Sequence, residues 1–223
     1  MANALQRLEE RPIEPTGETL LEVRDLHVEF RTDYGIVHAV NGISYSLRAG
    51  ETLAILGESG CGKSVSAQTI MGILDSPPGF VTKGEILYKG KDMLKLPQDQ
   101  QRRLRGAEIA MVFQDALSAL NPVFTVGYQI SEMFRVHRGT SKSEAKKKAI
   151  ELLDRVRIPS AKDRYADYPH QFSGGMRQRA MIAMAIALDP DILIADEPTT
   201  ALDVTVQAQI MELLADLQRE KGM

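Results

Sequence analysis

The stretch GESGCGKS, at residues 57–64, decides most of the fold that we expect for this chain. It matches the pattern G-x-x-x-x-G-K-S/T of a phosphate-binding loop. The apolar run TLAILG, residues 52–57, leads into it and predicts a buried strand. Residues 63–74 predict a helix that ends before Pro77-Pro78-Gly79. A glycine-rich turn without function is the alternative, but the strand–loop–helix order favours a loop that binds phosphates.

The residue types in this loop suit an anion with several phosphate groups. Three glycines, Gly57, Gly60 and Gly62, let backbone N–H groups converge on one anion without obstruction by a Cβ atom. The start of the helix near Gly62 adds a favourable dipole. Lys63 supplies a positive charge for the β- and γ-phosphates, and the hydroxyl of Ser64 is suited to Mg²⁺.

A second motif, ILIADEP at residues 192–198, ends an apolar strand in two acids. Ligands of open α/β sheets bind at the carboxyl ends of the strands, which is where Asp196 is expected. Asp196 can hold the shell of Mg²⁺, and Glu197 can polarise a water that attacks the γ-phosphate. The alternative interpretation is a pair of helix N-terminal acids in front of Pro198.

A third motif, QFSGGMRQR at residues 171–179, places Ser173-Gly174-Gly175 before a helix and so predicts another anion site. The phosphates of one ATP do not need two glycine-rich helix starts. The second start therefore suggests contact with a nucleotide bound to another subunit. The alternative is a plain helix cap followed by two glycines.

With these motifs in this order, the sequence resembles the nucleotide-binding subunit of an ABC transporter over roughly residues 20–223. Gln114, after the strand IAMVF, matches the Q-loop of that family, and Ala201-Leu202-Asp203 matches its D-loop. Tyr34 stands 23 residues before Gly57, where the family places the aromatic ring that stacks on adenine. A tyrosine at a hairpin edge is the alternative for Tyr34. Phe172 and Met176 depart from the commoner leucine and glutamine.

The resemblance implies three sets of site residues. The catalytic residues are Lys63, Gln114 and Glu197, and the Mg²⁺ ligands are Ser64, Gln114 and Asp196. The residues that contact the nucleotide include the phosphate loop and, from another subunit, the signature and the D-loop: Tyr34, Gly57, Glu58, Ser59, Gly60, Cys61, Gly62, Lys63, Ser64, Val65, Ser173, Gly174, Gly175, Met176 and Asp203. Cys61 is interpreted as a tolerated small residue, with a redox-sensitive thiol as the alternative.

Strands that alternate with helices, some of them continuously apolar, favour a mainly parallel sheet covered on both faces. Together with the resemblance, they predict an α/β fold: a P-loop NTPase (RecA-like) core with N-terminal antiparallel strands and an inserted helical subdomain. We expect a flexible leader at residues 1–19. The nucleotide-binding core should comprise residues 20–114 and 185–223, and the helical subdomain residues 115–184, where apolar residues recur at helical spacing.

Three phrases around these motifs, SALNPVFTVGYQI, YPHQFSGGMRQR and DEPTTALDVTVQAQI, resemble the ATPase subunits of dipeptide and oligopeptide importers. Nickel importers and other relatives share them, so the cargo stays open. The resemblance implies hydrolysis of ATP with Mg²⁺ as a cofactor. It also implies a second ABC ATPase subunit, identical or related, two membrane permeases and an extracytoplasmic substrate-binding protein. The chain would lie peripherally at the cytoplasmic face of the cell membrane.

Composition limits the other classes of protein. The 223 residues carry 30 acidic and 27 basic side chains, a formal charge of −3, which argues against a strongly basic nucleic-acid binder. The single cysteine excludes an internal disulfide, and the four histidines show no metal-ligand spacing. A soluble ABC ATPase of DNA repair or translation is an alternative, although no tandem cassette or coiled-coil insertion is present. The signature and the inserted helices do not fit a P-loop kinase or GTPase.

The C-terminal end of the sequence departs from the family pattern. The family carries a switch histidine at the end of a strand that follows the last helix seen here. This chain ends at Met223 before such a strand, and none of its four histidines fits that role by position. We therefore expect a truncated chain that binds nucleotide but hydrolyses it poorly.

Overall fold

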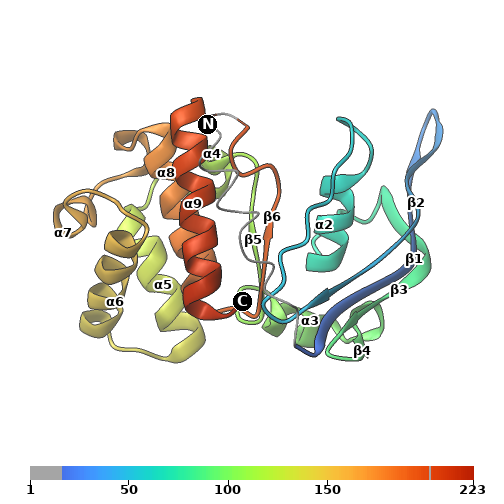
Figure 1. Cartoon of the computed structure of the whole chain (residues 1–223), viewed down its shortest axis with the longest axis horizontal. Coiled ribbons are helices and arrows are strands. Elements are labelled where there is room, and N and C mark those ends of the chain that lie inside the picture. Colours follow the sequence, from blue (N-terminus) through green and yellow to red (C-terminus); the bar gives the residue numbers. More distant parts are fainter. Residues whose placement is uncertain (1–16, 201) are drawn as a thin grey trace. The chain divides into compact units, whose positions relative to one another are not determined.

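The computed structural model of the chain describes residues 17–200 and 202–223, so most of the expected leader lies outside it (Figure 1). The chain divides into two compact units. The first runs up to Arg105 and includes Gly222–Met223, and the second spans Gly106–Lys221.

An antiparallel sheet with the strand order β2-β1-β3-β4 forms the frame of the first unit. Its strands are β1 (Thr19–Thr32), β2 (Gly35–Arg48), β3 (Gly79–Tyr88) and β4 (Lys91–Asp92). The predicted N-terminal antiparallel strands are therefore present. The chain reverses between β1 and β2 at Asp33-Tyr34, and not at the turn-forming pair Asn41-Gly42, which lies inside β2.

A β-bulge in β1, the strand between β2 and β3, explains the position of Asn41-Gly42. Asp25 has a positive φ of 46°, and the register of β1 shifts between Val23 and Leu26 against β2 and between Arg24 and His27 against β3. Because of this extra residue, Val23 and Leu26 both face the core, although strict alternation would put them on opposite faces. Gly42 and Gly84 flank the bulge with positive φ, and a Cβ on Gly84 would lie 2.5 Å from the carbonyl oxygen of Asp25.

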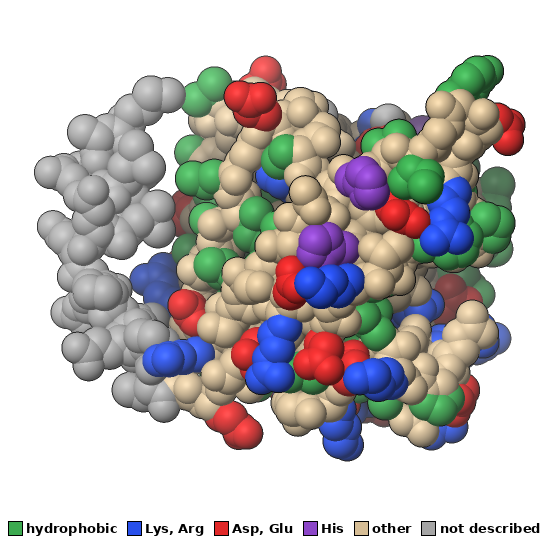
Figure 2. Space-filling model, turned by 90° about the vertical axis from the view of Figure 1, so that its right-hand side faces the viewer, with side chains coloured by type: hydrophobic (Ala, Val, Ile, Leu, Met, Phe, Trp, Pro, Cys, Tyr) green, Lys and Arg blue, Asp and Glu red, His purple; other side chains and the backbone are tan. Residues whose placement is uncertain are grey.

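Charged side chains of both signs lie next to one another on the face that Figure 2 presents. On β1 and β3, Asp25 accepts from the ammonium of Lys83 at 2.6 Å and contacts the ring of His27 at 2.9 Å. These two partners lower the pKa of the Asp25 carboxyl. Exposed pairs of this kind contribute little to stability. They do pair acidic with basic side chains along the sheet.

The helices of the first unit are α2 (Lys63–Met71) and α3 (Gln98–Leu104), with a 3-10 turn, η1 (Met93–Lys95), before α3. The prediction carried the first helix to residue 74, but it ends at Met71. Gly72 takes a left-handed conformation there, and the guanidinium of Arg105 donates to the carbonyl oxygens of Met71 and Gly72. These bonds satisfy carbonyl groups that the end of the helix leaves without partners.

The strand predicted at residues 52–57 is wrong for this structure. No strand is assigned between residues 49 and 78, and the side chains of Leu53, Ile55 and Leu56 are exposed. A buried strand needs a ladder partner for its N–H and C=O groups, and the described part of the first unit supplies none for this segment. An apolar run favours burial, but a strand also needs a neighbouring strand to pair with, which the run itself does not contain.

In the second unit, β5 (Ile109–Val112) and β6 (Ile192–Ala195) pair in parallel, with Ile109 opposite Ile192. Helices surround this pair: α4 (Ala116–Ala119), α5 (Val126–Arg138), α6 (Lys142–Arg155), α7 (Ala161–Arg164), the 3-10 turn η2 (Pro169–Gln171), α8 (Gly174–Ile186) and α9 (Val204–Lys221). At the start of α6, the hydroxyl of Ser141 accepts from the N–H of Glu144 and caps the helix. The helix α8 is rich in small residues and is mostly buried. None of the described helices is long and apolar enough to cross a bilayer.

One titrating group, the phenol of Tyr45, makes the stability of the first unit fall at alkaline pH. Burial raises the pKa of the Tyr45 phenol on β2 to about 12, whereas an unfolded tyrosine titrates near 10. The folded state therefore holds this proton more tightly. Its contribution to stability is complete below about pH 10 and is lost as the pH rises through about 12.

We expect Tyr45→Phe to lose less stability than the parent as the pH rises from about 10 to about 12. Urea midpoints at about pH 8 and about pH 11, with Tyr34→Phe as the exposed control, measure this difference, and equal losses in Tyr45→Phe and the parent would contradict it.

Candidate functional site

The predicted phosphate loop is shaped by glycines that no other residue could replace without strain. Gly62 caps the start of α2 with a φ of 94°, and a Cβ there would lie 2.2 Å from the carbonyl oxygen of Ala39 on β2. Gly60 also has a positive φ, of 81°. On Gly57, a Cβ would meet the sulfur of Cys61 at 2.5 Å. The close approach of the loop to β2 thus adds a packing reason for glycine to the electrostatic one.

Lys63 folds back onto the loop that precedes it. Its Nζ donates to the carbonyl oxygens of Gly57 and Glu58, at 2.9 Å each, and lies 4.0 Å from the sulfur of Cys61. The first turn of α2 carries no acidic side chain that could compete for its N-terminal N–H groups. A positive charge and the positive end of a helix dipole therefore lie within one short loop, the combination that binds phosphate.

The other predicted residues of the first unit are accessible. Glu58, Ser59 and Cys61 are exposed, and Ser64 and Val65 are half-buried at the start of α2. Tyr34 is fully exposed at the β1–β2 turn. In Figure 1 this turn and the loop before α2 lie at the same end of the first unit. The roles of Tyr34 in stacking and of Cys61 as a thiol stay predictions.

In the second unit, Gln114 and Glu197 meet at the carboxyl ends of β5 and β6. The Nε2 of Gln114 donates to Oε2 of Glu197 at 3.0 Å, and the hydroxyl of Thr200 donates to the same oxygen at 3.0 Å. The N–H of Asp196 donates to the carbonyl oxygen of Val112 at 3.0 Å and so extends the parallel ladder by one residue. Two strands far apart in sequence thereby bring together three of the predicted residues.

Glu197 has a left-handed backbone conformation with a φ of 45°, which is uncommon for a residue with a side chain. Such a conformation costs on the order of 1 kcal/mol and persists only when its surroundings fix it. Here the N–H of Thr200 donates back to the carbonyl oxygen of Glu197 and closes the turn. The backbone and two side-chain donors together aim this carboxylate in one direction.

The predicted signature begins α8. Ser173 caps the helix, because its Oγ accepts from the N–H of Met176 at 3.3 Å. Gly175 leaves no room for a side chain, since a Cβ would lie 2.8 Å from a methyl group of Val206 on α9. A Cβ on Gly174 would lie 3.5 Å from Leu202 in the predicted D-loop. The signature and the D-loop are therefore packed against each other.

Other positions of these motifs explain some of their departures from the family pattern. Phe172 is buried, so a large apolar side chain there serves packing. Met176 is half-buried, and Asp203 is exposed with its carbonyl oxygen accepting from the N–H of Gln207. Ala201, the first residue of the predicted D-loop, lies outside the described residues.

The residues predicted to hold Mg²⁺ fit a magnesium ion by their chemistry. A hydroxyl from Ser64, an amide oxygen from Gln114 and a carboxylate from Asp196 are the hard oxygen ligands that this ion prefers. Gln114 uses only its amide nitrogen on Glu197, which leaves its amide oxygen as an acceptor. Within the described ranges no cluster of three or more His, Cys, Asp or Glu side chains could hold a metal.

Three residues of this site were missed from the sequence: Thr200, Gln207 and Arg179. Gln207 donates from its Nε2 to the carbonyl oxygen of Thr199 at 2.9 Å and so holds the loop after Glu197. The only signal for Thr200 was its position directly after the DEP motif. Arg179, the last residue of FSGGMRQR, is buried despite its charge. Its polarity pointed to the surface, so pattern alone could not find it.

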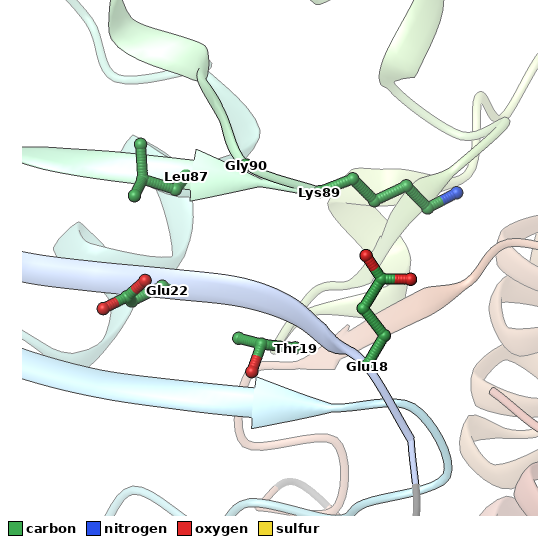
Figure 3. A pocket seen from close by; sticks show the side chains of 6 residues that line it. All are labelled: Glu18, Thr19, Glu22, Leu87, Lys89 and Gly90. Carbon is green, nitrogen blue, oxygen red and sulfur yellow. The ribbon is translucent and has the colours of Figure 1, made fainter.

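A shallow pocket at one end of the antiparallel sheet is separate from these motifs. Figure 3 shows the residues that line it: Glu18, Thr19, Glu22, Leu87, Lys89 and Gly90. Glu22 pairs there with Arg24, which lowers the pKa of its carboxyl. None of the lining residues belongs to a predicted nucleotide motif, so we do not assign this pocket to the site.

Comparison with known proteins places these features in a family. The profile of the family described as ABC transporter matches residues 40–200. The chain is 54% identical over 201 residues to the oligopeptide transport ATP-binding protein OppD of Bacillus subtilis (strain 168), a match that covers 90% of this chain and 56% of OppD. It is 55% identical over 203 residues to the dipeptide transport ATP-binding protein DppD of the same strain, with coverage of 91% and 61%. The chain thus spans about three fifths of the length of these curated relatives.

A solved structure supports the same placement. The dimeric, post-hydrolysis state of the ATP-binding cassette MJ0796 bound to ADP and Pi matches with a TM-score of 0.79 at 31% identity. That match covers 91% of this chain and 84% of the cassette. The predicted α/β P-loop NTPase fold is confirmed by this likeness. With the family profile matched over more than half of its residues, the chain belongs to the ABC transporter family.

Proposed function

We propose that this chain is the ATP-binding and ATP-hydrolysing part of a subunit that powers an ABC importer for dipeptides or oligopeptides. The observation that carries the proposal is the carboxylate of Glu197, aimed by Gln114 and Thr200 at the end of β6 and adjacent to Asp196. The identities of 54% and 55% to OppD and DppD, whose names state oligopeptide and dipeptide transport, support the cargo.

In the proposed mechanism, the backbone of Gly57–Ser64 and the ammonium of Lys63 bind the β- and γ-phosphates of ATP. Ser64, Gln114 and Asp196 would hold Mg²⁺, which would supply positive charge to neutralise these phosphates. Glu197 orients a water molecule toward the γ-phosphate and accepts its proton. Tyr34 stacks on the adenine. Most of the rate enhancement comes from positioning and from charge stabilisation in a site without bulk water.

We further propose that two such subunits meet head to tail and enclose two ATP molecules. Each site takes Gly57–Ser64, Gln114, Asp196 and Glu197 from one chain, and Ser173–Met176 with Asp203 from the other. The dimeric state of the MJ0796 cassette supports this arrangement. The partner is either a second copy or a related ATPase. Closure is driven by the greater affinity of the closed state for ATP than for ADP.

The proposed domains are the core, residues 20–114 and 185–223, and the helical subdomain, residues 115–184, with a leader at 1–19. An exposed apolar group on the helical part, Val123, Phe124 and Tyr128, supports the contact with two membrane permeases. The buried amide of Gln129 bonds both Asn121 and Phe124 and fixes this surface. The subunit would then lie at the cytoplasmic face of the membrane, with a substrate-binding protein on the other side.

Reconstitution tests the proposed function. The protein, at the length of its relatives, is purified with its co-purifying permeases, placed in liposomes, and assayed for ATP hydrolysis with the cognate binding protein inside or outside. We expect hydrolysis to rise when that binding protein carries a dipeptide or oligopeptide. Stimulation by Ni²⁺ and not by peptide would overturn the cargo, and the absence of any co-purifying permease would favour a soluble ATPase.

A further inference from the structure

We propose that Arg179 and Gln209 are positioning residues that lock the signature to the D-loop, so that each chain offers both to its partner's nucleotide as one preformed surface. This inference rests on the proposed function, because only a site shared between chains needs such a surface. Neither residue belongs to the predicted nucleotide contacts. The residues that they hold in place do.

Arg179 joins three helices from a buried position. It lies in α8, six residues after Ser173, and only 7% of its surface is exposed. Its guanidinium donates to the carbonyl oxygen of Val156, at the end of α6, and to Oε1 of Gln209 on α9, at 3.0 Å each. Both acceptors are neutral. Burial, with the charge of Arg157 nearby, lowers the pKa of Arg179.

A buried cation held by neutral acceptors is costly, because the hydrogen bonds do not replace the full solvation of the charge. An apolar side chain of similar size would pack at this place without that cost. The guanidinium instead provides N–H donors in a fixed planar geometry. These donors fix the angle between the helices that carry its two acceptors. We infer that the arginine serves the placement of α8 against α9.

A second tie acts on the same face of α9. Arg157 donates to Glu212 at 3.2 Å and to Asp216 at 2.7 Å. Together with Gln209, these acceptors occupy positions i, i+3 and i+7 of the helix, which form one stripe. Arg179 and Arg157 therefore both bond to the same stripe of side chains on α9.

The surface fixed in this way is the one that the proposed mechanism lends to the partner. The first turn of α9 touches the signature, since Val206 fills the space beside Gly175 and Leu202 lies beside Gly174. Gln207 of the same turn bonds the loop that carries Thr199 and Thr200. A shift of α9 would thus displace the D-loop from the signature and would also loosen the loop after Glu197.

Gln209→Ala removes the tie and no buried apolar side chain, because Gln209 itself is exposed. Hydrogen exchange is measured on the nucleotide-free protein. We expect the amides of Leu202, Gln207 and Met176 to exchange about threefold to tenfold faster, the change for the loss of about one hydrogen bond. Residues 57–64 should keep their rate. The matched control is Met211→Ala, which truncates an exposed side chain two residues further along α9. Unchanged exchange in Gln209→Ala, or equal acceleration in the control, would overturn the proposal.

A second measurement gives a readout that a general loss of stability would not move. In a Glu197→Gln background, ATP-dependent dimer formation is followed by size-exclusion chromatography. We expect Gln209→Ala to weaken the dimer about threefold to tenfold while the affinity of the monomer for ATP stays unchanged. Arg179→Lys keeps the charge but cannot reach both acceptors. Its dimer affinity should lie between those of the Glu197→Gln parent and Gln209→Ala. If the Glu197→Gln parent itself forms no dimer with itself or with a related ATPase, the proposed shared site fails, whereas the exchange experiment still decides the tie.

Discussion

Lys63→Ala should abolish binding of ATP at concentrations that saturate the parent protein. The ammonium is the cation that the loop holds against its own main chain, bonded to Gly57 and Glu58 at 2.9 Å each. In the proposed complex it donates instead to phosphate oxygens. Two charge-assisted hydrogen bonds, at about 1.5–3 kcal/mol each, correspond to a rise in Kd of about 100-fold or more.

The measurement is a titration with ATP and Mg²⁺ followed by calorimetry, together with a thermal melt. Lys91→Ala, an exposed lysine on β4 of the same unit, is the matched control for the loss of one positive charge. We expect the control to bind ATP as the parent does, and Lys63→Ala to keep its fold. A Lys63→Ala protein that bound ATP with the parent's Kd would show that residues 57–64 are not the phosphate site.

Local sequence signals predicted most of the secondary structure, since caps and breakers act within a few residues. Ser173 caps the helix that its motif predicted, and the strands at 109–112 and 192–195 follow their apolar runs. The failures share one cause. The run at 52–57 has no ladder partner in the described structure. The helix predicted to reach residue 74 ends at Met71, where Gly72 and the guanidinium of Arg105 close it. Both depend on neighbours that a local pattern does not contain.

The same limit applies to the site. The motifs named Gln114 and Glu197 separately, but the 3.0 Å hydrogen bond between them spans 83 residues of sequence and follows from the pairing of β5 with β6. The glycines of the signature were explained by an anion, whereas the structure adds the side chain of Val206, against which Gly175 packs. Residue types predicted the chemistry of the site, whereas the orientation of its side chains follows from tertiary contacts.

Glu197→Gln should leave ATP bound but stop its hydrolysis. The substitution keeps the shape of the side chain and an oxygen that can accept from Gln114 and Thr200, which now hold the carboxylate at 3.0 Å each. It removes the negative charge and with it the ability to take a proton from water. Loss of a general base lowers turnover by about 10²- to 10⁴-fold, while Kd for ATP should change by less than about twofold.

Thr200→Val separates aiming from proton transfer at the same carboxylate. It deletes one of the two donors on Oε2 but leaves Glu197 charged, so we expect turnover to fall by only about tenfold, as for one lost hydrogen bond. Turnover is measured in protein extended to the length of the relatives, with saturating ATP and Mg²⁺. Because Gln114 still donates to Glu197 in this variant, the order parent, Thr200→Val, Glu197→Gln should be monotonic. A Glu197→Gln protein that turned over at the parent's rate would remove Glu197 from the mechanism and leave Asp196 as the acid of this strand end to be tested next.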